Sequence, residues 1–225
     1  MIIYIPDKID NIDNIEIGCL CTISHCNCLS REKKIFVDIG LRAAQSSSFS
    51  IFDYLRLIQR VFKKGAEIYA VIPDVFCNSR KTLENFNKYY KIISRYAKTV
   101  FVLQYFYVDI DIYRDVLDVV DVVALPAHKH CDVTCIARPR VCAERIERAL
   151  RRLYNYKIHL LGPVIRTLRI LRGTLWNIYS FDTSSYRKAP NKKAKEKLGG
   201  KWQVTDNTVA TNWFIEWLKQ AGIIA

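Results

Sequence analysis

Short apolar runs alternate with longer amphipathic segments along most of the chain. The runs that predict β-strands are residues 2–5, 16–24, 34–40, 68–75, 99–106, 121–127, 157–163 and 176–182. The later runs are almost continuously apolar, which is typical of strands buried on both faces. Apolar residues at helical spacing predict helices at 51–64, 83–98, 111–119, 142–154, 164–172 and 209–220. We expect Ser50 and Thr82 to cap the first two of these helices.

Eight candidate strands with helices between them predict an α/β protein built on a (β/α)8 TIM-type barrel. The alternation is regular from the third strand onward, so we expect the barrel to be degenerate at its N-terminal strands. A doubly wound open sheet is the competing architecture. No glycine-rich nucleotide motif follows any strand. We expect the barrel to span 1–186, and 187–225 to form a basic loop and a C-terminal helix packed on the barrel.

Composition narrows the class of protein. Half of the 225 residues are apolar, which excludes a disordered chain. No apolar run reaches the length of about 20 residues that a membrane helix needs. The N-terminus lacks the basic and apolar regions of a secretory signal. We therefore expect a soluble, cytoplasmic protein with no membrane partner.

The charge excess favours a polyanionic partner. The formal net charge is +13, and residues 187–201 hold seven Lys or Arg against one Glu. A second stretch, 138–152, holds six Arg against two Glu. A solvated surface is the alternative interpretation, but two separate basic clusters favour nucleic acid, because Lys and Arg contact phosphates. The candidate contacts in the first cluster are Arg187, Lys188, Lys192, Lys193 and Lys195.

The cysteines leave three interpretations open. Cys19, Cys21, Cys26 and Cys28 are spaced C-x-C-x4-C-x-C, and Cys131, Cys135 and Cys142 form a looser group. Neither spacing is that of a zinc ribbon, so metal binding, disulfides and core packing all stay open. His128 and His130, next to Cys131, form a weaker candidate metal site. A metal-dependent protein that uses the first cluster is therefore one alternative function.

Four strands end in a polar residue: Asp38, Asp74, Gln104 and Asp182. Side chains at the carboxyl ends of parallel strands converge on one mouth, where active sites lie. An Asp at such a position can instead cap the following helix. Two carboxylates at one mouth permit double displacement at an anomeric carbon, one as nucleophile and one as proton donor. A carboxylate and an amide can also read the edge of a purine.

The ordered motifs FVDIG, VIPDV, FVLQ, VALP, HLLGP and YSFDTSSY resemble the barrel core of the tRNA-guanine transglycosylases. They are more similar still to the shorter relatives that insert 7-deazaguanine bases into DNA. The resemblance covers about residues 34–190. It implies that Asp182 is the nucleophile and Asp38 the general acid and base, in Asp-Ile-Gly where the family has Asp-Ser-Gly. It implies substrate-binding roles for Asp74, Gln104 and Gly162, and a backbone contact at 125–127.

The implied activity exchanges guanine for a 7-deazaguanine base in nucleic acid, through a covalent glycosyl intermediate and without metal or organic cofactor. No Cys or His follows His159, so the zinc site that the tRNA-modifying enzymes carry after the nucleophile is absent. We therefore expect DNA rather than tRNA as substrate. The alternatives are an inactive nucleic-acid-binding barrel and a nucleoside or glycoside hydrolase. His159 itself is either a phosphate or ribose ligand or a core histidine.

Overall fold

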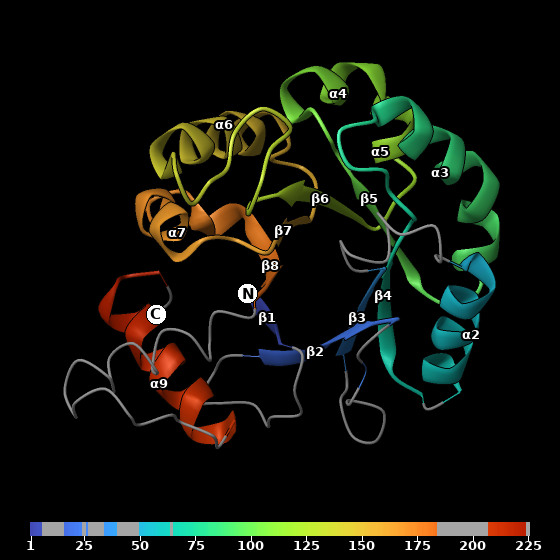
Figure 1. The fold of residues 1–225 in the computed structure, drawn as a ribbon, viewed down its shortest axis with the longest axis horizontal. Helices are drawn as coiled ribbons and strands as arrows, with labels where there is room; N and C mark the ends of the chain where they lie inside the picture. Colours follow the sequence, from blue (N-terminus) through green and yellow to red (C-terminus); the bar gives the residue numbers. More distant parts are fainter. Residues whose placement is uncertain are drawn as a thin grey trace.

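The computed structural model describes residues 1–5, 16–23, 26, 34–39, 50–63, 65–183 and 207–223. In these ranges, eight parallel strands pair in sequence order, and β8 pairs with β1 to close a barrel (Figure 1). The strands are β1 (Ile2–Ile5), β2 (Glu16–Thr22), β3 (Lys34–Asp38), β4 (Glu67–Val71), β5 (Lys98–Val102), β6 (Val122–Pro126), β7 (Ile158–Leu161) and β8 (Ile178–Asp182). The closed barrel confirms the α/β class and excludes the open sheet.

Helices surround the barrel on its outer face (Figure 1). They are α2 (Ile51–Phe62), α3 (Ser79–Ile93), α4 (Phe106–Ile112), α5 (Arg114–Leu117), α6 (Pro139–Arg152), α7 (Ile165–Leu171), the 3-10 helix η1 (Leu175–Asn177) and α9 (Asn207–Gln220). The apolar face of α9 joins the same core as the barrel, and Arg169 of α7 lies over the ring of Trp217. None of the helices described is both long and apolar enough to cross a membrane.

Several element boundaries differ from the expectation. Ser50 caps α2 as expected, since its Oγ accepts a hydrogen bond from the Asp53 N–H. Thr82 caps nothing: α3 begins earlier, at Ser79, and Asn78 caps it by accepting from the Lys81 N–H at 2.9 Å. The buried Thr82 instead accepts a hydrogen bond from the Val75 N–H.

The helix expected at 111–119 is two short helices, α4 and α5, and the first begins at Phe106. The expected strand 99–106 therefore ends early, at Val102, because the Asp109 carboxylate accepts from the Tyr105 N–H and starts a helix there. The connections on either side of β2 lie largely outside the described residues. The expected degeneracy at the start of the barrel stays a prediction.

Strand alternation divides the core into two layers. One cluster of buried side chains comes from strands alone and fills the barrel: Ile2, Tyr4, Phe36, Tyr69, Val71, Val100, Val102, Val122 and Ala124. The other, larger cluster combines the outward strand residues with the helices. Inside the barrel, the ring of Tyr4 lies across Gly18 so closely that a Cβ at that position would overlap it. Glycine is therefore needed at position 18.

A β-bulge changes which side chains of β8 face inward. Ile158 pairs with Ile178 but His159 pairs with Ser180, so Tyr179 is an extra residue in β8. Tyr179 belongs to the inner cluster and Phe181 to the outer one. Since alternate residues of a strand share a face, the bulge turns Ser180 and Asp182 toward the barrel interior.

Candidate functional site at the carboxyl mouth

The residues expected at strand ends lie at one end of the barrel, which we call the carboxyl mouth. Asp38 and Asp182 are the last residues of β3 and β8. Asp74 and Gln104 follow β4 and β5 by a few residues, and Gly162 directly follows β7. All strands are parallel, so these positions share the end at which barrel enzymes place their active sites.

Asp182 is held by two hydrogen-bond donors. Its Oδ1 accepts a hydrogen bond from the Gly162 N–H at 2.8 Å and lies 3.1 Å from Nε2 of His159. Gly162 has a φ of +56°, a left-handed conformation that glycine adopts without strain. Within the described part of the chain, both hydrogen bonds to Asp182 end on Oδ1. The side chain is 16% exposed, so it faces the mouth without being fully open to water.

His159 links the nucleophile candidate to the barrel interior. Its ring is completely buried and stacks on Phe36 with centroids 4.0 Å apart. The other ring nitrogen, Nδ1, lies 2.8 Å from the Ser180 hydroxyl. A carboxylate only accepts, so Nε2 donates to Asp182, and Nδ1 shares the second hydrogen bond with the Ser180 hydroxyl. His159 is a core histidine, as one of the two interpretations held, but it also orients Asp182.

Asp74 and Gln104 form a second polar pair. Nε2 of Gln104 donates to Oδ2 of Asp74 at 2.8 Å, and Oε1 of Gln104 accepts from the Cys77 N–H at 2.9 Å. The amide of Gln104 is 3% exposed, and both of its ends have a partner in the chain. Burial raises the pKa of the Asp74 carboxyl above its ordinary value, and the Gln104 hydrogen bond opposes this shift. In this conformation Gln104 therefore orients Asp74.

Asp38 ends β3, which pairs with β4, the strand that leads to Asp74. Between β3 and β4, the buried hydroxyl of Tyr54 lies 3.0 Å from the Val37 carbonyl oxygen and 2.6 Å from that of Val71. Burial raises the pKa of Tyr54 well above its ordinary value, and the charges of Asp38 and Asp74 raise it further. Both carboxylates thus act on one hydroxyl at this side of the mouth.

The two candidate catalytic carboxylates come from strands that are not neighbours. β3 and β8 are separated by β1 and β2 in the barrel order. Lys34, Phe36 and Asp38 occupy alternate positions of β3, so Asp38 is on the same inward face as Phe36. The bulge turns Asp182 inward on β8. The candidate phosphate contacts Arg187, Lys188, Lys192, Lys193 and Lys195 lie outside the described residues.

The cysteines are paired as disulfides in the described ranges. The pairs are Cys21–Cys26, Cys77–Cys131 and Cys135–Cys142. Cys19 is also disulfide-bonded, and Cys28 lies outside the described residues. The expected grouping of His128, His130 and Cys131 is wrong: His128 is exposed, and His130 lies instead with Cys135 and Cys142. Burial, with the Arg145 charge, lowers the pKa of His130 to about 4.

Two residues that contact the groups of the carboxyl mouth, Ser180 and Tyr54, were not predicted from the sequence. Ser180 carries a signal, because it stands two positions before Asp182 and so shares its face of the strand. The sequence indicates only that Tyr54 is a core residue of a helix. The structure shows that its hydroxyl lies between β3 and β4.

No protein-family model, curated protein or solved structure matches this chain. The resemblance to guanine transglycosylases therefore depends on the order of its sequence motifs alone.

Proposed function

We propose that this protein is a base-exchanging transglycosylase on a TIM-type (β/α)8 barrel, and that it replaces guanine in nucleic acid, DNA in preference to tRNA, with a 7-deazaguanine base. The observation that supports this most strongly is Asp182 itself. It is an inward carboxylate at the carboxyl end of a barrel strand, held through one oxygen by the His159 ring and the Gly162 N–H. Such a group is oriented for attack, with Oδ2 left for the reaction.

The first half-reaction makes and breaks one bond at the sugar. Oδ2 of Asp182 attacks C1′ of the nucleoside, the glycosidic bond breaks, and guanine leaves with a proton from Asp38. In the second half-reaction, Asp38 removes a proton from the incoming 7-deazaguanine base. That base attacks C1′ from the face that guanine left and displaces Asp182. Two inversions give net retention.

Asp74 suits the recognition of a guanine edge. A carboxylate accepts hydrogen bonds, and guanine offers adjacent N–H donors on its Watson–Crick edge. Burial disfavours the Asp74 anion, as its raised pKa indicates. Donors from the base would stabilise that anion, so part of the cost of burial is recovered when guanine binds. Gln104 then supports recognition by fixing the orientation of Asp74.

A basic rim would hold the nucleic acid. The N-terminal end of α6 follows β6 on the side of the carboxyl mouth, and both Arg138 and Arg140 are exposed there. Farther along the same stretch, Arg145 pairs with Asp132 and Arg152 with Asp111, so these two are less available to phosphates. We expect further phosphate contacts from the basic residues of 187–201, which lie outside the described residues. The target guanine must leave the base stack, at a cost of a few kcal/mol.

The test is a base-exchange assay with labelled guanine on DNA and on tRNA, using Asp182→Asn against the parent chain. We expect exchange on DNA, its loss by at least about 10³-fold in Asp182→Asn, and retained nucleic-acid binding. Asp115→Asn, an exposed carboxylate on α5, is the matched control and should exchange normally. Withholding the incoming base should trap a nucleic-acid adduct on Asp182, which peptide mass spectrometry locates.

Other outcomes separate the alternatives. Release of free guanine without incorporation of label identifies a hydrolase. Tight binding with neither exchange nor release, equal in parent and Asp182→Asn, identifies an inactive nucleic-acid-binding barrel. An adduct on any carboxylate other than Asp182 contradicts the assignment of the nucleophile.

A further inference from the structure

The loop between β6 and α6, together with the start of α6, brings three metal-ligating side chains together. His130, Cys135 and Cys142 each offer one donor atom, and these atoms all lie within 4.8 Å of one another. Cys135 and Cys142 are fully buried, and His130 is 4% exposed. The group is therefore enclosed by protein, unlike a chance cluster on the surface.

His130 supplies a second, independent observation. Within the described part of the chain, neither of its ring nitrogens has a hydrogen-bond partner of good geometry, and the Pro126 backbone is a marginal one. A buried polar atom without a partner costs about 1–3 kcal/mol, and buried polar groups in proteins are nearly always satisfied. An ion that accepts a lone pair from the imidazole would satisfy one of these nitrogens.

The backbone around the group is well fixed. The His130 N–H donates to the Val133 carbonyl at 2.8 Å, and the Cys135 N–H donates to the His128 carbonyl at 3.1 Å. Arg145 of α6 binds both carboxylate oxygens of Asp132, at 2.6 and 2.7 Å. The loop that carries two of the donors is thus fastened to the helix that carries the third.

We propose that His130, Cys135 and Cys142 bind one Zn²⁺ when the two cysteines are thiols. One imidazole and two thiolates are a common zinc donor set, and a water molecule completes a tetrahedral site of three protein ligands. Donors around such an ion lie roughly 3–4 Å apart, from bond lengths of about 2.0–2.3 Å. The Cα atoms of the two cysteines are 5.5 Å apart, so the sulfurs can separate from the disulfide without a large backbone movement.

The two states of the cysteines exclude each other. Sulfurs that are bonded to each other are not thiolates and cannot both ligate a metal. Disulfides are uncommon in reducing compartments, where both residues would be thiols. The zinc would then take over the role of the disulfide, which is to fasten the β6–α6 loop at the carboxyl mouth. This site does not depend on the proposed exchange activity.

The test measures zinc in the full chain, purified under reductant from zinc-supplemented medium. We expect one Zn²⁺ per chain, lost in His130→Gln and Cys142→Ser and retained in the matched control His128→Gln, an exposed histidine of the same loop. Cobalt added to the metal-free reduced protein should give the thiolate charge-transfer bands of a tetrahedral site. Zinc should also raise the melting temperature of the reduced parent chain.

His130→Cys keeps the result interpretable if His130→Gln fails to fold. Three thiolates also bind zinc, so this variant should retain the metal, with a cobalt spectrum shifted by the extra sulfur. A reduced, folded parent chain that takes up neither zinc nor cobalt would overturn the proposal. So would zinc in a folded His130→Gln variant at the level of the parent chain.

Discussion

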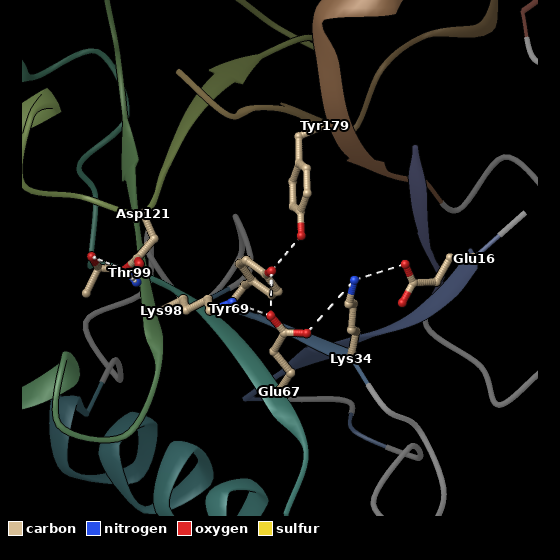
Figure 2. A network of polar contacts seen from close by, with 8 residues as sticks. All are labelled: Glu16, Lys34, Glu67, Tyr69, Lys98, Thr99, Asp121 and Tyr179. Atoms are coloured by element: carbon tan, nitrogen blue, oxygen red, sulfur yellow. Dashed lines mark hydrogen bonds and ion pairs between the residues drawn. The ribbon is translucent and has the colours of Figure 1, made fainter. Parts of the chain in front are cut away.

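The two ends of the barrel use charged residues in opposite ways. At the amino end, β2, β3, β4 and β5 each begin with a charged residue, and the signs alternate: Glu16, Lys34, Glu67 and Lys98. Lys34 lies 2.9 Å from Glu16 and 3.9 Å from Glu67, and Lys98 pairs with Glu67 (Figure 2). The Tyr69 hydroxyl donates to Glu67 and lies 2.5 Å from that of Tyr179.

At the carboxyl mouth, the described contacts of Asp74 and Asp182 involve no lysine or arginine. Asp182 is bound by an imidazole and a backbone N–H, and Asp74 by an amide. The charges of the amino end pair with one another within the network. The contacts at Asp74 and Asp182 instead orient single carboxyl groups. The comparison teaches that ion pairs join neighbouring strands at one end of the barrel, and that hydrogen bonds fix individual side chains at the other.

The largest expected effect comes from His159 at the mouth. His159→Phe keeps the stacking on Phe36 but removes the donor to Asp182. We expect kcat for base exchange to fall by about 10²-fold, because a misplaced reacting group has a cost of that order, while KM changes little. His159→Gln, which can still donate, should recover part of the rate. An unchanged kcat in His159→Phe would show that the histidine only fills the core.

At the amino end we expect the reverse outcome. Lys34→Met leaves Glu16 without its near partner and weakens the pairing of Glu67, so the free energy of unfolding should fall by about 1–3 kcal/mol. Exchange measured well below the melting temperature should stay at the parent rate. Lys81→Met, an exposed lysine of α3, is the control and should change the unfolding free energy little. Loss of exchange in folded Lys34→Met would contradict the division between the two ends.

Two glycines with positive φ give a matched pair. Gly162 at the mouth has a φ of +56°, and Gly65, which precedes β4 at the amino end, has a φ of +76°. A Cβ at either position meets ordinary contacts or open space, so alanine should cost each about 1–2 kcal/mol of backbone strain. Gly162→Ala keeps the N–H but strains the backbone that points it at Asp182, so this variant should also lower the exchange rate, and Gly65→Ala should not. Equal rates in the two variants would argue against a need for this backbone conformation in exchange.

The smallest effect concerns the stability of the mouth against pH. Burial raises the pKa of Asp74 above 3.8 in the folded protein, so the folded state binds this proton more tightly than the unfolded state does. Stability therefore falls as the pH rises from 3.8 through the folded pKa. We expect Asp74→Asn to increase the free energy of unfolding at neutral pH, and the gain to shrink as the pH falls toward 3.8. Urea unfolding at several pH values measures it, and a gain independent of pH would contradict this origin.

The sequence predicted the strands and the shared end of their polar residues, because apolar runs and strand-end polarity are local signals. It did not predict which residues contact one another. The residues next to Gln104 in the sequence give no sign of its hydrogen bonds to Asp74 and to the Cys77 N–H. The predicted partners of His130 were wrong, because the loop folds back and places His130 beside Cys135 and Cys142. The ion-pair network of the amino end was not predicted, although each of its charged residues is the first residue of a strand.

The bulge in β8 has a consequence for anyone who alters this strand. At the bulge, β8 contains one more residue than the segment of β7 with which it pairs. Because of this extra residue, the carboxylate of Asp182 faces the barrel interior and Phe181 faces the helices. Deleting a single residue there would exchange their directions, even though every remaining amino acid kept its identity. The length of β8, as much as its composition, is therefore part of the site.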